Sequence, residues 1–279
     1  MSRRALVVVR GGGDLGTGVA HRLAGAGYRV VVLETDRPRV VRRAAAFAEA
    51  VYSGRATVEG VTAVLVEPSA EEALRAAGRS EGGEGGPVVA VMVDPEGRSI
   101  SELSPDVIVD ARMAKRNLGT RRSDAALTLG LGPGFEAGAD VDLVVETQRG
   151  PSLGLVIEDG AAIADTGVPG EVAGFTLERL IRSPAAGRFI SRAGIGDVVS
   201  AGQVVGEVAG IPVRTSLSGL LRGLLADGLE VSEEEKLGDV DPRGESVDPS
   251  MISDKAARIG DSVLAALVSR GPRPDGAGR

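Results

Sequence analysis

The stretch Gly11-Gly12-Gly13-Asp14-Leu15-Gly16-Thr17-Gly18 separates an apolar run, Ala5 to Val9, from a segment with apolar residues at helical spacing. Gly11, Gly13 and Gly16 fit the pattern G-x-G-x-x-G. In that pattern the glycines permit a tight turn, the approach of a phosphate to the backbone, and close packing of helix on strand. The stretch therefore predicts a strand, a phosphate-binding turn that includes Asp14 and Thr17, and a helix. A glycine-rich turn that only closes the packing is the alternative.

A second apolar strand is expected from Arg29 to Leu33, and it is followed by Glu34. Glu34 stands at the distance past the glycines where dinucleotide-binding domains place the acid that bonds a ribose hydroxyl group. Arg37 follows closely and can accept a 2'-phosphate, so NAD and NADP both stay open as cofactors.

Strand-like segments recur along the first part of the chain and alternate with helical patterns, near Val61 to Val66, Val88 to Val93 and Val107 to Asp110. This alternation predicts an α/β fold, a Rossmann-like doubly wound parallel sheet, over residues 1–125. Shorter β-like pieces separated by glycine and proline follow, which predicts a mixed β-rich connecting region over residues 126–180.

An internal repeat with an offset of 32 residues joins positions such as Gly187 and Gly219, and Val199 and Val231. The repeat predicts pseudo-symmetric halves of a small β module over residues 181–245, similar to biotinyl/lipoyl-like barrel-sandwich hybrids. The hairpin between the halves, near residues 210–214, contains no lysine, so no carrier function is expected. Residues 246–279 are predicted to form a C-terminal helix and a disordered tail.

Composition excludes several classes of protein. A net charge of −7 lacks the basic footprint expected of proteins that bind nucleic acid or anionic membranes. The absence of cysteine excludes disulfides, zinc-thiolate sites and iron-sulfur clusters. No metal site is expected. The chain is predicted to be a cytoplasmic protein, and a homo-oligomer stays open.

Two basic clusters follow the ends of predicted strands: Arg37, Arg39, Arg42 and Arg43, and Arg112, Lys115, Arg116, Arg121 and Arg122 after Asp110. Open α/β sheets bind ligands at the carboxyl ends of their strands. The clusters therefore predict a positive crevice for a phosphorylated small molecule, with Asp110, Arg112, Lys115 and Arg116 in it. Solvated arginines are the alternative. No spacing identifies a set of catalytic residues.

Several short motifs occur in one order along the chain: residues 9–18, Val51-Tyr52-Ser53-Gly54, Val58-Glu59-Gly60-Val61, Asp110-Ala111-Arg112-Met113-Ala114-Lys115, Leu131-Gly132-Pro133-Gly134-Phe135 and Glu146-Thr147-Gln148-Arg149-Gly150. In these motifs the chain resembles the YqeB-like accessory proteins of the selenium-dependent molybdenum hydroxylase system. The resemblance implies a bacterial cytoplasmic maturation factor that handles the molybdopterin cofactor, with a molybdenum hydroxylase or its maturation proteins as partners.

Three functions are compatible with these observations. The first is a cofactor-handling maturation factor whose Rossmann-like domain binds a molybdopterin-type cofactor or a nucleotide. The second is an NAD(P)-dependent oxidoreductase, which the glycine turn and Glu34 would serve equally well. The third is a nucleotide-sensing module without catalysis.

Overall fold

The computed structural model describes residues 4–79, 86–165, 167 and 171–274. The chain forms two compact units, which are described separately. Unit 1 comprises Met1–Pro38, Ala46–Asp165 and Ile252–Arg279, and unit 2 comprises Arg39–Ala45 and Thr166–Met251.

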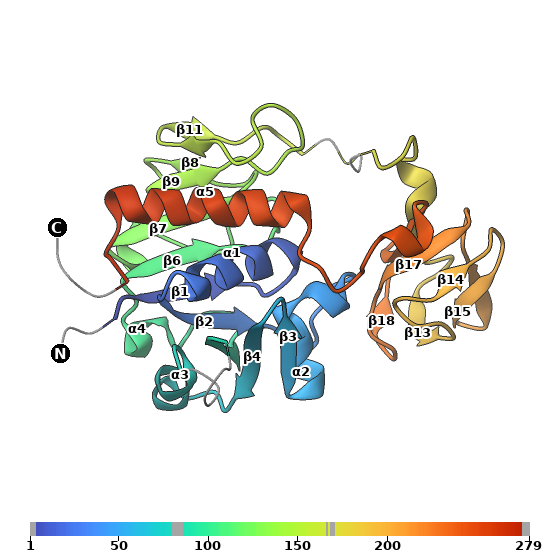
Figure 1. The fold of residues 1–279 in the computed structure, drawn as a ribbon, viewed down its shortest axis with the longest axis horizontal. Coiled ribbons are helices and arrows are strands. Elements are labelled where there is room, and N and C mark those ends of the chain that lie inside the picture. Colours follow the sequence, from blue (N-terminus) through green and yellow to red (C-terminus); the bar gives the residue numbers. More distant parts are fainter. Residues whose placement is uncertain (1–3, 80–85, 166, 168–170, 275–279) are drawn as a thin grey trace. The chain divides into compact units, whose positions relative to one another are not determined.

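Unit 1 is built on a nine-stranded mixed sheet with the order β10-β9-β7-β6-β1-β2-β5-β4-β3 (Figure 1). The seven inner strands are parallel, and β3 and β10 at the two edges pair antiparallel with their neighbours. The strands are Leu6–Arg10 (β1), Arg29–Glu34 (β2), Arg55–Val58 (β3), Val61–Val66 (β4), Val88–Val93 (β5), Val107–Asp110 (β6), Leu127–Leu131 (β7), Leu143–Val145 (β9) and Val156–Ile157 (β10). Glu136–Ala137 (β8) and Gly160–Ala161 (β11) form a separate antiparallel pair.

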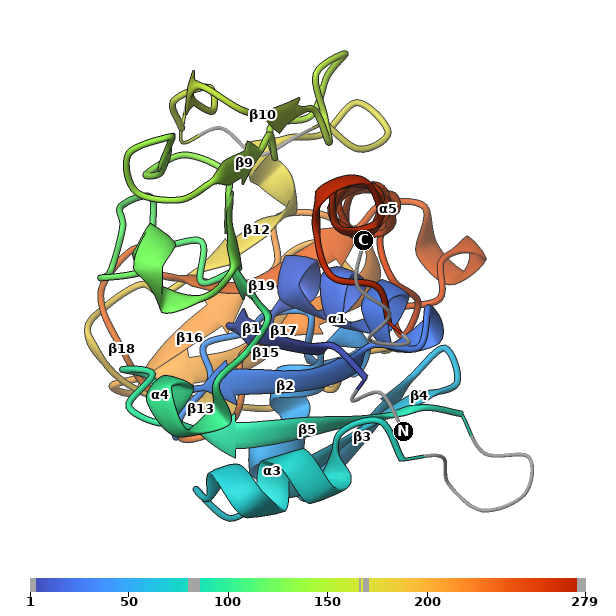
Figure 2. The same cartoon turned by 90° about the vertical axis from the view of Figure 1, so that its left-hand side faces the viewer.

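Helices cover both faces of this sheet (Figure 2). Because successive side chains of a strand point to opposite faces, Val7 and Val9 of β1 pack with helices Asp14–Gly25 (α1) and Asp254–Arg270 (α5). Leu6 and Val8 pack on the other face with Ala70–Ala76 (α3) and Ile100–Leu103 (α4). Both faces of β1 are fully buried. The short helix Ala50–Ser53 (α2) lies between β2 and β3 along the chain.

Small residues let α1 and α5 pack closely. A Cβ atom built at Gly18 would lie 2.5 Å from the carbonyl oxygen of Ala256, and one at Gly260 would lie 2.5 Å from the carbonyl oxygen of Gly18. Ser253 begins α5 as its N-cap, since its hydroxyl group accepts a hydrogen bond from the Ala256 amide. The helix expected near the C-terminus is therefore present, and it packs against the helix that follows the glycine turn.

Unit 2 contains two four-stranded antiparallel sheets, with the orders β12-β19-β17-β14 and β16-β15-β13-β18. The strands are Leu180–Arg182 (β12), Gly187–Ser191 (β13), Val198–Val199 (β14), Val204–Val208 (β15), Ile211–Arg214 (β16), Gly219–Leu224 (β17), Glu230–Val231 (β18) and Lys236–Asp241 (β19). Phe189, Leu221 and Leu237 are among the buried residues of its core. A buried ion pair joins Arg179 and Asp239, with an N–O distance of 2.8 Å.

The first basic cluster helps to hold residues 39–45 in unit 2. Arg39 forms an ion pair with Glu235, Arg42 donates to the Met251 carbonyl group, and Arg43 donates to the Leu224 carbonyl group. Three of the four arginines expected around a ligand crevice therefore have protein partners within unit 2.

The predicted fold, a Rossmann-like doubly wound parallel sheet followed by a barrel-sandwich hybrid, is wrong. The sheet of unit 1 is mixed, and the connections after β6 contain no long helix. A doubly wound sheet would carry crossover helices there, whereas α5 from the end of the chain covers this part of the sheet through its packing with β9 and β10. Unit 2 is organised as two antiparallel sheets.

The boundaries predicted from the sequence differ from those of the two compact units. The division at 125/126 lies between β6 and β7, inside the large sheet, and α5 belongs to unit 1. The predicted β module at 181–245 lies within unit 2. The end of the predicted tail, residues 275–279, lies outside the described residues. None of the helices in the described ranges combines the length and apolar character needed to span a membrane.

The close packing of α1 and α5 gives a test of the fold. Gly18→Ala should lower the free energy of unfolding by about 1–3 kcal/mol, because the new methyl group overlaps the Ala256 backbone. Gly25→Ala is the matched control in α1, since a Cβ atom there meets nothing within 4 Å. It should be neutral or stabilise by up to about 1 kcal/mol. Equal effects of the two variants in urea denaturation would contradict the packing.

Candidate functional site

The best-formed polar site lies at the carboxyl ends of β1 and β6, the central pair of parallel strands. Arg10 and Asp110 are the last residues of these strands and stand side by side in the sheet register. β2, the next strand along the chain, pairs with one edge of β1, and β6 pairs with the opposite edge of β1. The strand order of the sheet therefore reverses at β1. Parallel sheets bind ligands outside the carboxyl ends of their strands at such a reversal of strand order.

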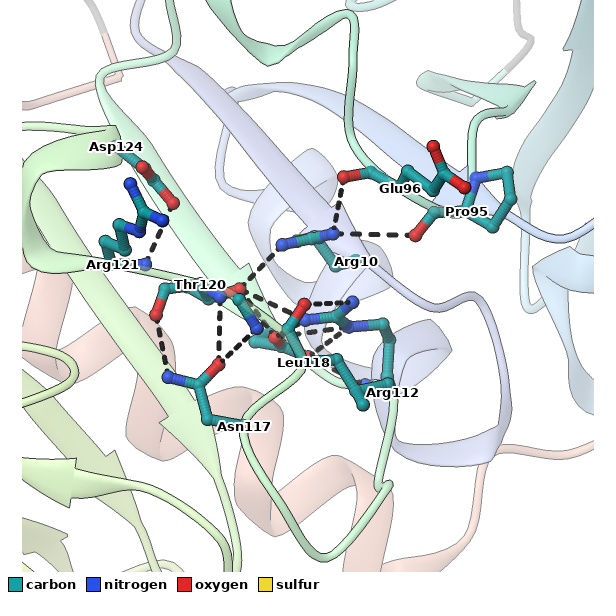
Figure 3. Close-up of polar contacts among 11 residues, drawn as sticks. Arg10, Pro95, Glu96, Arg112, Asn117, Leu118, Thr120, Arg121 and Asp124 are labelled. Atoms are coloured by element: carbon teal, nitrogen blue, oxygen red, sulfur yellow. Dashed lines mark hydrogen bonds and ion pairs between the residues drawn. The ribbon is translucent and has the colours of Figure 1, made fainter.

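Four side chains form one hydrogen-bonded group here, termed the Arg10–Thr120 cluster: Arg10, Asp110, Arg112 and Thr120. Figure 3 shows Arg10, Arg112 and Thr120 of this cluster. The Thr120 hydroxyl group donates to Asp110 Oδ2 at 2.7 Å and accepts from Arg10 Nη1 at 2.8 Å and Arg112 Nη2 at 3.2 Å. One donor and two acceptor positions exhaust the capacity of a hydroxyl group. The three charged neighbours of Thr120 therefore occupy every hydrogen-bonding position of its hydroxyl group.

Asp110 and Arg112 neutralise each other within this cluster. Arg112 Nε lies 3.0 Å from Asp110 Oδ1, and its Nη2 donates to Asp110 Oδ2. Asp110 is 1% exposed and the side chain of Arg112 is 16% exposed, so the pair is largely removed from water. Such a two-point pair holds both side chains in one geometry.

Among the residues that the structure describes, no carboxylate contacts Arg10 directly. It is 3% exposed, and its Nη2 donates to the carbonyl oxygens of Glu96 at 3.0 Å and Pro95 at 3.5 Å. Its buried Nε has no hydrogen-bond partner in the described part of the chain. Burial lowers the pKa of Arg10, repulsion from Arg112 lowers it further, and Asp110, Asp124 and Asp94 offset part of this pKa decrease.

An open groove of about 550 Å³ lies over Arg10. Its charged lining consists of Arg10, Glu96, Arg98, Arg121 and Asp124, and α4 supplies Ile100 and Ser101. Arg98 pairs with Glu96, and the Asp124 carboxylate accepts a hydrogen bond from the Arg121 amide. The groove therefore has mixed charge at its rim and an arginine at its base.

A neighbouring cavity of about 450 Å³ includes Asp94, which follows β5. The Asp94 carboxylate accepts hydrogen bonds from the amides of Gly97, Arg98 and Ser99 and from the Ser99 hydroxyl group. Burial acts to raise the pKa of Asp94, but these hydrogen bonds outweigh burial and the net pKa is lowered. Asp94 thereby fixes the turn that carries Glu96 and Arg98.

The backbone groups of Gly12 in the glycine turn form hydrogen bonds with other residues of the protein. The Gly12 amide donates to Glu34 Oε2 at 2.7 Å, and the Gly12 carbonyl accepts from the Ala48 amide at 2.9 Å and from Thr17 Oγ1 at 2.9 Å. A Cβ atom at Gly16 would lie 2.0 Å from the Gly11 carbonyl oxygen. Gly11 and Gly16 therefore serve close backbone packing, and Glu34 has a backbone partner in the turn.

Other predicted site residues are not part of one crevice. Gly13 is the half-buried N-cap of α1, and Asp14 in its first turn accepts a hydrogen bond from Ser253. Lys115 is exposed and pairs with Asp165 at 2.6 Å. Arg37 and Arg116 are exposed. Among the predicted ligand residues, the structure brings Asp110 and Arg112 together, and separately Gly11, Gly16, Thr17 and Glu34 around the glycine turn.

Sequence reasoning missed Arg10 and Thr120. An arginine that closes an otherwise apolar strand is a signal for Arg10, because burying it requires polar partners. No local pattern marks Thr120, which reaches Asp110 from ten residues further along the chain. Within the described residues, no group of three or more His, Cys, Asp or Glu residues could hold a metal ion.

A curated protein resembles this chain over nearly all of it. The chain is 48% identical over 267 residues to "Uncharacterized protein YqeB" of Escherichia coli (strain K12). In sequence, this chain is similar to YqeB. The alignment covers 96% of the chain and 48% of YqeB, so the chain spans about half the length of this relative. No family model matches the chain.

Solved structures show only a loose likeness. An aspartoacylase family protein from Mesorhizobium loti has 11% identity and a TM-score of 0.26, with 85% of this chain and 84% of that chain covered. A succinylglutamate desuccinylase/aspartoacylase from Rhodobacter sphaeroides has 14% identity and a TM-score of 0.24, with 86% and 85% covered. The ectoine utilization protein EutE from Ruegeria pomeroyi has 15% identity and a TM-score of 0.25, with 85% of each chain covered.

The predicted function requires a correction. A maturation factor that binds a phosphorylated ligand, with a nicotinamide-dependent oxidoreductase or a nucleotide-sensing module as alternatives, is wrong. The physical reason lies in the glycine turn, where Glu34 and the backbone of Ala48 bond to Gly12.

The central hydroxyl group gives a test of the Arg10–Thr120 cluster. Thr120→Val should lower the free energy of unfolding by about 2–4 kcal/mol, because it leaves buried charged groups without a shared partner. Thr120→Ser keeps the hydroxyl group and should cost less than about 1 kcal/mol. Urea denaturation of both variants measures the difference. A loss in Thr120→Val that is no larger than the loss in Thr120→Ser would contradict the role of the hydroxyl group.

Asp94 gives a test that depends on pH. Its lowered pKa stabilises the fold above the ordinary pKa of aspartate, about 3.9, and this contribution is lost as the pH falls through the folded-state pKa. Asp94→Asn should therefore cost about 1–2 kcal/mol near neutral pH. The difference from the unmodified protein should shrink in acid, as denaturation at a series of pH values would measure. A penalty that is independent of pH would contradict this role.

Proposed function

We propose that unit 1 binds a small carboxylate in the groove above Arg10. The observation that carries this proposal is a buried guanidinium group that lines an open groove and contacts no carboxylate of the described ranges. An isolated buried charge is unfavourable unless it is paired. A bound anion supplies the missing partner.

The charge distribution around Arg10 supports an anion of low charge. Arg112 is neutralised by Asp110, whereas Arg10 forms no ion pair with any residue in the part of the chain that the structure describes. Glu96 and Asp124 also line the groove and would repel a dianion such as a phosphate monoester. A carboxylate carries one negative charge in a planar group that matches the geometry of guanidinium.

The size and position of the groove also support a small ligand. Its volume of about 550 Å³ lies within the usual range for small-molecule sites, about 300–1,000 Å³. It opens at the carboxyl ends of parallel strands, and the turns that line it are fixed by Asp94 and by the Arg10–Thr120 cluster. Side chains that are already held in place reduce the entropy lost on binding.

Membership of the selenium-dependent molybdenum hydroxylase system stays a prediction from the sequence motifs. The predicted cofactors, partners, cytoplasmic location and homo-oligomer likewise stay predictions. The carboxylate proposal depends on none of them.

Calorimetric titration of the protein with acetate and lactate tests the proposal, with inorganic phosphate and AMP as competitors of different charge. At least one carboxylate should bind more tightly than either phosphate compound. Arg10→Met should weaken that binding by about 10-fold or more, because a charge-assisted hydrogen bond contributes about 1.5–3 kcal/mol.

Two further variants keep the result interpretable. Arg98→Ala removes an exposed arginine of the same groove and should change the affinity much less than Arg10→Met. Arg10→Lys keeps the charge and serves if the methionine variant unfolds. Unchanged carboxylate binding by a folded Arg10 variant, or preferential binding of AMP, would overturn the proposal.

A further inference from the structure

The groove above Arg10 contains an acid with a carboxylate oxygen to offer a ligand. Asp124 lines the groove and is half-buried. One of its oxygens, Oδ2, accepts a hydrogen bond from the Arg121 amide at 2.9 Å. Within the described residues, the other oxygen, Oδ1, accepts no hydrogen bond and forms no ion pair. A positively charged group of a ligand can therefore bind Asp124 without displacing a protein partner.

The other charged side chains at the rim are either paired or exposed. Arg98 Nε donates to Glu96 Oε2 at 2.7 Å, so these two charges largely cancel. Arg121 is exposed, and dissolved salt screens its charge. Burial lowers the pKa of Arg10, and Asp124 is among the acids whose charge offsets part of that decrease. The groove therefore offers a buried positive charge and, within electrostatic reach of it, a negative charge.

An apolar wall adjoins the guanidinium group of Arg10. Ile100 and Ala125 line the groove and pack against the buried core on that face of the sheet. A Cβ atom built at Gly97 would lie 2.7 Å from Ile100 Cδ1 and 3.2 Å from Arg10 Nη2. The cation and the aliphatic side chain therefore border the same point of the groove, and the glycine leaves that point open.

We propose that the groove binds a small α-amino acid with an aliphatic side chain, an inference that rests on the carboxylate site proposed above. The carboxylate of the ligand binds Arg10, its ammonium group faces Asp124, and its side chain packs against the apolar wall. An amino acid carries these three groups on one carbon atom, and their three partners line one groove. A zwitterion supplies Arg10 with an anion and Asp124 with a cation, so both protein charges are paired.

Calorimetric titration of the intact protein with three ligands of nearly equal size tests this proposal. L-Alanine carries both charges, L-lactate has a hydroxyl group in place of the ammonium group, and L-alaninamide has an amide in place of the carboxylate. L-Alanine should bind at least about fivefold more tightly than either of the other two, because each of them lacks one charged contact. L-Valine should bind more tightly than glycine, since only valine has a side chain that can contact the apolar wall.

Variants of the two charged residues separate this proposal from the carboxylate site itself. Arg10→Met should weaken the binding of both L-alanine and L-lactate. Asp124→Asn keeps an oxygen for the Arg121 amide, and it should weaken L-alanine by about fivefold without weakening L-lactate. Asp140→Asn is the matched control and should change neither affinity. Asp140 also accepts a backbone hydrogen bond, from the Glu136 amide at 3.1 Å, but it lines the neighbouring cavity.

The outcomes distinguish a failure of this proposal from a failure of the carboxylate site. L-Lactate binding that depends on Arg10 and equals L-alanine binding would overturn the amino-acid proposal alone. So would L-alanine binding that is insensitive to Asp124→Asn, or equal binding of glycine and L-valine. Binding of neither L-alanine nor L-lactate, or unchanged binding of both by a folded Arg10 variant, would overturn both proposals. Thermal unfolding confirms that each variant is folded.

Discussion

The hydroxyl group of Thr120 holds together the side chains at the carboxyl ends of β1 and β6 in the large sheet. It joins Arg10 at the end of β1, Asp110 at the end of β6 and Arg112 in the loop that follows. Asp110 and Arg112 are satisfied by one another, whereas Arg10 is bonded to uncharged oxygens. The cluster therefore fixes the loop beside the groove and leaves a buried positive charge at its base. That combination of rigidity and unpaired charge is the basis for assigning a carboxylate to the groove.

The glycine turn performs a different task from the one its pattern suggests. Its glycines allow the turn to approach Ala48 and Ala111, and Glu34 bonds to the Gly12 amide. The helix that leaves the turn then packs on α5 at Gly18 and Gly260. This packing places two helix N-termini together, where the Ser253 hydroxyl group donates to Asp14. A motif associated with phosphate thus serves the packing of two helices in this chain.

Local patterns predicted the positions of most central elements. Apolar runs correctly indicated the strands at β1, β2, β5 and β6, and Ser253 correctly indicated the start of α5. The overall fold was predicted wrongly because α5 covers a part of the sheet far from it in sequence, which no local pattern reveals. Asp110 and Arg112 were recognised as special, but their spacing of two residues did not show that they would pair with each other. The contacts of Arg10 span up to 110 residues, so its partners could not be inferred from the sequence.

The central claim is that Arg10 is a buried cation whose missing partner is a carboxylate. Nuclear magnetic resonance of the Arg10 Nε–H group measures this most directly, with the signal assigned by comparison with Arg10→Lys. The account predicts a signal protected from exchange with solvent, because Nε is buried, that moves when lactate is added and stays in place when inorganic phosphate is added. A signal that stays in place with every carboxylate, or moves equally with phosphate, would contradict the account.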